Sequence, residues 1–304
     1  MPSNKTGLCL SGGGAKGAFQ VGVFEYLAEH PELYPHGFDA ASGCSVGAVN
    51  LGGLAKFKSG PEQVKSWTTY MVECWSKLTK TSDVWTKRFP PYLAGLWNPS
   101  IGDNAPLKAL LTELLSANFK DISDGTPCEV AAWDLLSGKP LYFSLNDAKD
   151  ARELVSFIAA SASFPLAFPP EQVGPYYCTD GGITEIAPAA RLIKSGCERI
   201  LAVVCRNPKV PTVMQKADLQ TVLAVAARCL DGMESEVVLG DLEKIRLWNL
   251  LVDAGHPSAQ GKKSIKLDVI EPLDSLGDPL DFSPALTQER RRKGYEAARQ
   301  YFEA

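Results

Sequence analysis

The chain has 304 residues, of which 45% are hydrophobic, and its 31 basic and 35 acidic residues give a formal net charge of −4. This composition excludes a largely disordered chain, which would combine low hydrophobicity with high net charge. It also argues against a nucleic-acid-binding protein, because such domains are usually strongly basic. We therefore expect an ordinary globular protein without a nucleic-acid partner.

Predicted strands and helices alternate along the chain. The expected strands are residues 6–11, 38–44, 176–179, 199–206 and 264–271, with a hairpin over 128–145 that turns at Gly138. The expected helices are a first one ending near His30, then 45–58, 61–80, 105–117, 148–162, 187–195, helices within 216–250, and one from about 285. This alternation predicts an α/β fold with a largely parallel sheet and helices on both faces.

No apolar stretch reaches the 18 residues that a membrane-spanning helix requires. The first residues contain no basic segment followed by an apolar one, so no signal peptide is expected. The cytoplasm is the expected compartment, and peripheral contact with membranes remains compatible with it. The eight cysteines form no C-x-x-C pair, so no metal site is expected.

A glycine-rich loop, Gly12–Gly17, follows the first strand and fits the pattern G-x-G-x-x-G. The same pattern marks dinucleotide sites, which need an acid at the end of the second strand, whereas Asp39 lies at its start. A P-loop would need Ser or Thr after Lys16, where Gly17 stands. The exposed backbone N–H groups at a helix N-terminus suit an oxyanion as well as a phosphate. A tight turn without chemistry is the alternative.

The segment Gly43–Gly47 matches the pattern G-x-S-x-G between a predicted strand and a predicted helix. A nucleophile elbow needs small residues on both sides of its serine, because the turn is strained and crowded. Ser45 would then stand at a helix N-terminus, and the N–H of Val46 can join those of the glycine loop. A chance match to a short pattern is the alternative.

A serine nucleophile needs a proton acceptor, for which the chain offers two candidates. Asp180 follows a short strand and precedes Gly181 and Gly182, so its carboxylate lies on a loop that allows close approach. Partial burial beside a hydroxyl raises the pKa of an aspartate and makes it a better base. The alternative role of Asp180 is an ordinary turn. His256 is the other candidate base, since the order Ser45, Asp180, His256 is that of α/β-hydrolase triads.

As a set, the glycine loop, the serine motif and Asp180-Gly181-Gly182 resemble the patatin-like phospholipase family. The segments Ser163–Pro170 and Asp180–Pro188 are also similar to blocks of that family. The resemblance covers about residues 6–206 and implies a patatin-like, three-layer α/β/α fold. We expect a single domain over residues 1–304, with the motif-bearing core at about 6–206 and an extension of helices and a strand at 207–304.

The resemblance implies a serine–aspartate dyad in which Ser45 is the nucleophile and Asp180 the general base. It implies an oxyanion hole formed by the N–H groups of Gly12, Gly13 and Gly14, which Val46 would complete. The expected supporting residues are Lys16, Gly17, Gly43, Gly47, Gly181 and Gly182. The implied reaction is hydrolysis of a lipid acyl ester, of the phospholipase A or lysophospholipase type, without metal or cofactor. The sequence offers no interpretation of Cys44, which precedes the serine.

Two other functions remain open. One is a carboxylesterase for small esters that uses Ser45, Asp180 and His256 as a triad. The other is a nonenzymatic lipid-binding or scaffold protein on the same fold, against which the intact Ser45 and Asp180 argue.

Two segments bear on contact with a lipid surface. The stretch 85–97 contains Trp85, Phe89, Tyr92, Leu96 and Trp97, and it forms either a wall for acyl chains at an interface or part of the core. The run Arg290–Lys293 either touches anionic lipid or forms the solvated face of a helix. The second interpretation is favoured because Glu289 and Glu296 flank the run.

Overall fold

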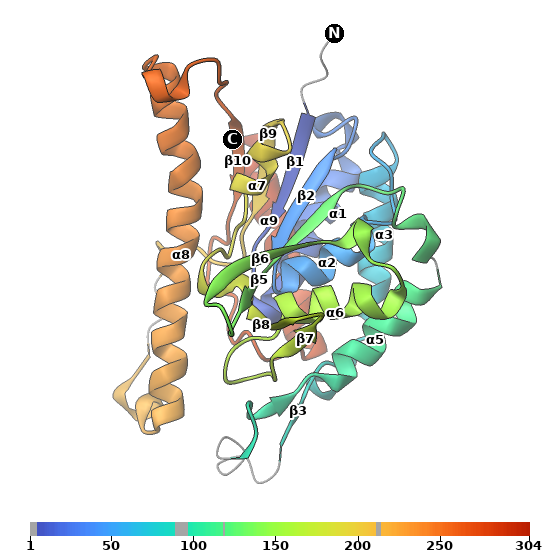
Figure 1. Ribbon diagram of the computed structural model, residues 1–304, viewed down its shortest axis with the longest axis vertical. Helices are drawn as coiled ribbons and strands as arrows, with labels where there is room; N and C mark the ends of the chain where they lie inside the picture. Colours follow the sequence, from blue (N-terminus) through green and yellow to red (C-terminus); the bar gives the residue numbers. More distant parts are fainter. Residues whose placement is uncertain (1–4, 89–96, 118, 211–213) are drawn as a thin grey trace.

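The computed structural model describes residues 5–88, 97–117, 119–210 and 214–304 (Figure 1). Its strands are β1 (Lys5–Leu10), β2 (Ala40–Cys44), β3 (Thr86–Lys87), β4 (Gly102–Asp103), β5 (Cys128–Asp134), β6 (Lys139–Ser144), β7 (Glu171–Val173), β8 (Tyr176–Asp180), β9 (Cys197–Val203) and β10 (Lys266–Ile270). Its helices are α1 (Ala18–Glu29), α2 (Val46–Leu54), α3 (Gln63–Ser76), α5 (Ala105–Ser116), α6 (Ala151–Ser161), α7 (Ala190–Lys194), α8 (Val222–Asp253) and α9 (Pro284–Glu303).

The central sheet of the described chain has eight strands in the order β10-β9-β1-β2-β5-β8-β7, with β6 paired to β5. Strands β10, β9, β1, β2 and β5 run parallel to one another, whereas β6 and β8 are antiparallel to β5. The prediction of a largely parallel sheet is therefore confirmed. Parallel pairing brings the carboxyl ends of β1 and β2 to the same edge of the sheet, and the glycine loop and Ser45 follow those two ends.

Helices cover both faces of the sheet and complete three layers. Successive side chains of a strand point to opposite faces, and β1 shows this clearly. Leu8 and Leu10 enter the larger core, which contains buried residues of α1, α2, α3, α5, α6 and α9, whereas Cys9 enters a second core with residues of α7 and α8. The three-layer α/β/α prediction is confirmed.

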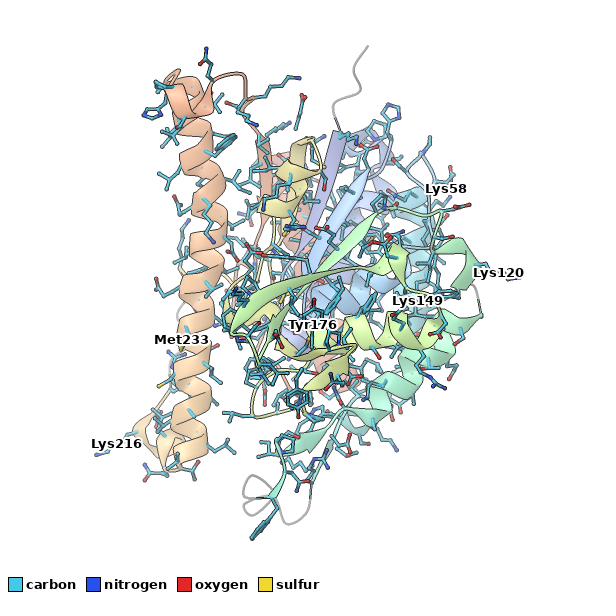
Figure 2. The ribbon with its side chains drawn as sticks, viewed as in Figure 1. Lys58, Lys120, Lys149, Tyr176, Lys216 and Met233 are labelled. Atoms are coloured by element: carbon cyan, nitrogen blue, oxygen red, sulfur yellow. The ribbon has the colours of Figure 1, made fainter. Side chains whose placement is uncertain are left out.

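The chain beyond residue 206 joins the same architecture. Strand β10 pairs with β9 at the edge of the sheet, and α9 packs along α1 (Figure 1). The helices expected within 216–250 are one helix, α8, which runs along one side of the molecule. Its buried residues, from Val238 to Ile245, lie in its second half. The side chains of the first half, residues 222–237, are half-buried or exposed, and Figure 2 labels the exposed Met233 there.

The two ends of the aromatic stretch 85–97 differ in their exposure to solvent. Trp85 is buried against Phe168 and donates its indole N–H to the carbonyl oxygen of Leu280 at 3.0 Å, so it belongs to the core. Trp97 is 85% exposed. Phe89, Tyr92 and Leu96 lie outside the described residues. No helix in the described parts of the chain is long and apolar enough to cross a bilayer.

Candidate active site

Ser45 occupies a strained turn between β2 and α2. Its backbone φ is +54°, a conformation that residues other than glycine seldom adopt. The N–H of Ser45 donates to both the carbonyl and the hydroxyl oxygen of Ser161, at 3.1 and 3.0 Å, which holds the turn in place. A Cβ added at Gly47 would lie 2.2 Å from the carbonyl oxygen of Leu10, so only glycine fits there. The turn has the geometry of a nucleophile elbow.

The glycine loop lies directly against this turn. A Cβ added at Gly12 would lie 3.1 Å from the Cβ of Ser45. Gly14 has a φ of +57°, and a Cβ there would come within 2.3 Å of the carbonyl oxygen of Pro279. The same oxygen accepts a hydrogen bond from the N–H of Ala15 at 2.7 Å. A segment near residue 279 therefore fixes the shape of the loop.

The N–H groups around Ser45 differ in whether they are already used. The N–H of Gly12 donates to the carbonyl oxygen of Ile186 at 3.1 Å, which removes it from the set available to an oxyanion. Within the described residues, the N–H groups of Gly13, Gly14 and Val46 have no acceptor. These three N–H groups are therefore the remaining candidate donors for an oxyanion hole.

Asp180 is 3% exposed and lies at the end of β8. Its Oδ1 accepts the N–H of Gly182 at 2.8 Å and the thiol of Cys44 at 3.3 Å. Its Oδ2 is buried and has no hydrogen-bond partner in the described structure, although the Ser45 hydroxyl is near enough to lower the pKa of the carboxyl. Burial outweighs these contacts and raises that pKa from 3.8 to about 6, which suits a base working near neutral pH.

All three histidines lie outside this site. His30, which is half-buried and stacks on Tyr26, and the exposed His36 lie near the end of α1. His256 is exposed beyond the end of α8, where its Nδ1 contacts the hydroxyl of Ser258. None of them lines the cavity described below. Glu234 of α8 does line the cavity, and roughly 28 Å of helix length separates it from the end of α8 near His256. The arrangement places Asp180, and not His256, beside Ser45.

One cavity of about 630 Å³ joins most of the predicted site residues. The predicted residues that line it are Gly12, Gly13, Gly14, Lys16, Ser45, Val46, Asp180 and Gly182. Four others, Gly17, Gly43, Gly47 and Gly181, lie behind it, where an added Cβ would meet a neighbouring atom at 2.2–2.8 Å. Much of the remaining wall is apolar and comes mainly from α3, α5 and the segment after α6. It includes Trp75, Leu78, Leu107, Leu110, Leu111, Leu114, Phe164 and Phe168.

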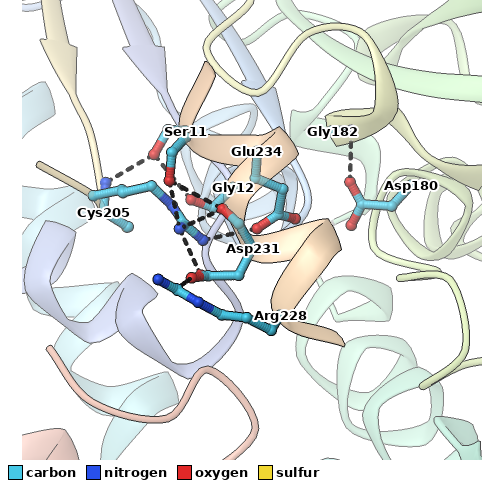
Figure 3. Close-up of polar contacts among 10 residues, drawn as sticks. Ser11, Gly12, Asp180, Gly182, Cys205, Arg228, Asp231 and Glu234 are labelled. Atoms are coloured by element: carbon cyan, nitrogen blue, oxygen red, sulfur yellow. Dashed lines mark hydrogen bonds and ion pairs between the residues drawn. The ribbon is translucent and has the colours of Figure 1, made fainter. Parts of the chain in front are cut away.

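A second, charged part of the wall lies where α8 approaches the segment after β9. Arg206 donates to the carboxylates of Asp231 and Glu234 at 2.5 and 2.8 Å, and Arg228 contacts Asp231 at 2.5 Å (Figure 3). Burial raises the pKa of Glu234 to about 7, against the lowering effect of Arg206. Burial, followed by the charge of Arg206, lowers the pKa of Lys16 on the same wall.

Arg290 supports the site from α9. The run Arg290–Lys293 was predicted to form the solvated face of a helix, but this prediction is wrong for Arg290, which is 1% exposed. Its guanidinium donates to the carbonyl oxygens of Leu276, Asp278 and Asp281 at 2.7–2.8 Å and to that of Ala15 at 3.3 Å. It thereby holds the segment that contains Pro279 against the glycine loop. The charge pattern of the run did not reveal this, because only the fold brings Ala15 beside α9.

The fold and the cavity define a class of protein: a three-layer α/β/α protein with a serine elbow and a buried carboxyl group facing one largely apolar cavity. Residues 8–193 match the family model described as patatin-like phospholipase. Since the match spans more than half of the 304 residues, the chain belongs to the patatin-like phospholipase family. Membership supports lipid acyl hydrolase activity in general terms.

Solved structures provide two remote similarities. VipD from Legionella pneumophila shares 14% identity at a TM-score of 0.46, and the alignment covers 99% of this chain and 67% of VipD. ExoU from Pseudomonas aeruginosa, solved in complex with SpcU, shares 15% identity at a TM-score of 0.36. That alignment covers 99% of this chain and 53% of ExoU, so the chain spans about half the length of ExoU. No curated protein matches the chain.

Proposed function

We propose that this protein is a phospholipase A or lysophospholipase that uses Ser45 as nucleophile and Asp180 as general base. One observation carries the proposal: Ser45 and Asp180 line the same largely apolar cavity, and Oδ2 of Asp180 is buried there without a hydrogen-bond partner among the described residues. A buried carboxylate with a pKa of about 6 accepts a serine proton more readily than an exposed aspartate does.

The reaction proceeds in two halves. Asp180 takes the hydroxyl proton of Ser45 as Oγ attacks the ester carbonyl, and the tetrahedral oxyanion accepts hydrogen bonds from the N–H groups of Gly13, Gly14 and Val46. The protonated Asp180 then gives its proton to the leaving alcohol, and an acyl-enzyme forms. In the second half Asp180 takes a proton from water, the hydroxide attacks the acyl carbonyl, and the fatty acid leaves as Ser45 regains its proton. The scheme uses no metal and no cofactor.

The cavity wall supports a lipid acyl chain as the substrate group. Leu107, Leu110, Leu111 and Leu114 present apolar side chains from α5 to the space beside Ser45. An acyl chain placed there leaves water, which contributes about 0.8 kcal/mol per buried CH₂ group. A small soluble ester would leave most of this wall unused.

The proposal is tested by measuring fatty acid release from phospholipids, lysophospholipids and short esters. Wild-type protein should release fatty acid, and Ser45→Ala should reduce turnover by more than about 100-fold with an unchanged melting temperature. A fluorophosphonate should label wild type and leave Ser45→Ala unlabelled. Retained turnover or labelling in Ser45→Ala would overturn the assignment of the nucleophile.

The two alternative functions receive less support. The triad carboxylesterase needs a histidine beside Ser45, and His256 is exposed and paired with Ser258. The nonenzymatic scaffold does not account for a strained serine beside a buried carboxyl group, because such strain costs stability and tends to persist at functional sites. We also propose that residues 1–304 act as one domain, since β10 extends the central sheet and α9 packs on α1.

A further inference from the structure

Cys44, the residue before the proposed nucleophile, contacts the proposed base. It is the last residue of β2 and is fully buried. Its Sγ lies 3.3 Å from Oδ1 of Asp180, on the oxygen that also accepts the N–H of Gly182. The other oxygen, Oδ2, has no partner among the described residues. Both fixed contacts therefore fall on one side of the carboxylate, and its second oxygen remains available.

The thiol of Cys44 can act only as a hydrogen-bond donor here. Burial, followed by the negative charge of Asp180, raises the pKa of this thiol well above its ordinary value. It therefore stays protonated at physiological pH and does not compete with Ser45 as a nucleophile. Since an ionised carboxylate accepts and does not donate, the hydrogen bond runs from Sγ–H to Oδ1.

We propose that Cys44 is a positioning residue of the catalytic dyad: its S–H and the N–H of Gly182 hold Oδ1 of Asp180 and so direct Oδ2 toward Ser45. The inference rests on the proposed function of the dyad. A thiol suits this task because it is a weaker donor than a hydroxyl, so it orients the carboxylate with a smaller loss of basicity.

Other charged groups near the pair must be separated from this effect. Glu234 and Asp241 of α8 both act electrostatically on Cys44, and Glu234 also feels the charge of Asp180. Lys16 and Arg206 line the same cavity as cations. Because the pKa of Glu234 is about 7, it titrates in the pH range where Asp180 does. The experiment is therefore repeated in a Glu234→Gln background.

The test compares the pH dependence of kcat/KM for wild type, Cys44→Ala and Cys44→Ser. Removing a donor from the ionised base makes that base harder to ionise, so Cys44→Ala should shift the acid limb upward by about 0.5–1 pH unit. Its kcat should fall several-fold with little change in KM, because the dyad loses orientation and not substrate contacts. Cys44→Ser keeps a donor on the same Cβ and should return the limb toward wild type.

A matched control is Cys128→Ala. Cys128 is a buried cysteine on the neighbouring strand β5, opposite Ala41 of β2, and burial alone raises the pKa of its thiol. This variant removes the same thiol group without touching Asp180, so its acid limb should match that of wild type. The proposal would be overturned if the acid limb of the pH profile were unchanged from wild type in Cys44→Ala, or if it shifted by the same amount in Cys128→Ala.

A second measurement does not depend on activity. The side-chain carboxyl carbon of Asp180 is titrated by NMR in ¹³C-aspartate-labelled Ser45→Ala protein, with the resonance assigned through Asp180→Asn. Adding Cys44→Ala should move the titration midpoint upward, and an unchanged midpoint would contradict the contact. If instead wild type releases no fatty acid while this midpoint does move, the proposed function fails and the hydrogen bond stands.

Discussion

The guanidinium of Arg206 and the carboxylate of Glu234 lie 2.8 Å apart on the wall of the cavity that holds Ser45. The same guanidinium donates to Asp231 and to the hydroxyl of Ser235, so one side chain just after β9 ties three residues of α8 to the sheet. The side chains of residues 222–237 of α8 are half-buried or exposed, and none is fully buried. These polar contacts therefore help to fix this half of the helix beside the cavity, together with the half-buried Val237, which packs against the second core.

Arg206→Gln should release the first half of α8. Removing the cation leaves two partly buried carboxylates without their main partner, which costs at least about 1.4 kcal/mol and corresponds to a tenfold change in a local opening equilibrium. Hydrogen exchange in residues 224–237 should accelerate by about that factor, while exchange in 238–250 stays unchanged. The control is Arg246→Gln, which breaks an exposed pair with Glu243 on the same helix. Equal exchange in wild type and Arg206→Gln would show that other contacts hold the helix.

Asp180→Asn should abolish activity and yet stabilise the fold. The folded-state pKa of about 6 lies above the ordinary 3.8, so the contribution of this group to stability is present below about pH 4 and is lost as the pH rises through 6. The neutral amide avoids this cost, which reaches about 3 kcal/mol near pH 8. Urea unfolding at about pH 4 and pH 8 measures the difference.

Asp134→Asn is the matched control for that measurement. The Ser137 side chain and backbone N–H groups lower the pKa of Asp134, so its ionised form stabilises the fold above the ordinary pKa. Its replacement should therefore destabilise the protein at about pH 8, with the opposite sign. A gain for Asp180→Asn that did not depend on pH would contradict the electrostatic explanation.

His256→Ala should leave ester hydrolysis unchanged. His256 is exposed beyond the end of α8, and its ring contacts Ser258 and no residue of the cavity. Steady-state kinetics on one phospholipid and one short ester should give kcat/KM values within about twofold of wild type, since surface substitutions usually have small effects. A folded His256→Ala protein without activity would instead support the triad.

Leu110→Trp should shorten the preferred acyl chain. Leu110 is half-buried on α5 and lines the cavity, so a larger side chain there takes space from a long chain. We expect kcat/KM for a palmitoyl ester to fall by about tenfold or more relative to a butyryl ester, as a loss of 1–3 kcal/mol of apolar contact would produce. Leu136→Trp, on the exposed hairpin turn between β5 and β6, should leave the ratio unchanged. A parallel loss on both esters would assign Leu110 to the core.

The sequence predicted those parts of the site whose geometry is local. A glycine run after a strand, a serine between two small residues and an aspartate before two glycines each determine their own turn, and the parallel sheet brings the turns together. The elements were predicted with errors of a few residues at their ends, apart from the short strands β3, β4 and β7, which were missed, and the continuity of α8. Short strands such as β7 carry too few residues to show a period.

Contacts between distant residues could not be predicted in the same way. Cys44 and Asp180 are 136 positions apart, and Arg290 and Ala15 are 275 positions apart. The run Arg290–Lys293 has the charge pattern of a solvated helix, and Arg291 and Lys293 do pair with Glu25 and Glu289. Only the packing of α9 against α1 places Arg290 inside the protein.

The position of Arg290 also means that the part of the chain that supports the glycine loop extends beyond the residues matched by the family model. The match ends at residue 193. The backbone of the glycine loop, however, is hydrogen-bonded to Pro279, and Arg290 of α9 holds the segment that contains Pro279 in place. A chimera that exchanged residues 8–193 with a relative would need to exchange this support as well. The glycine loop and the segment that supports it would therefore have to be inherited together, although more than 260 residues separate Gly14 from Pro279 in the chain.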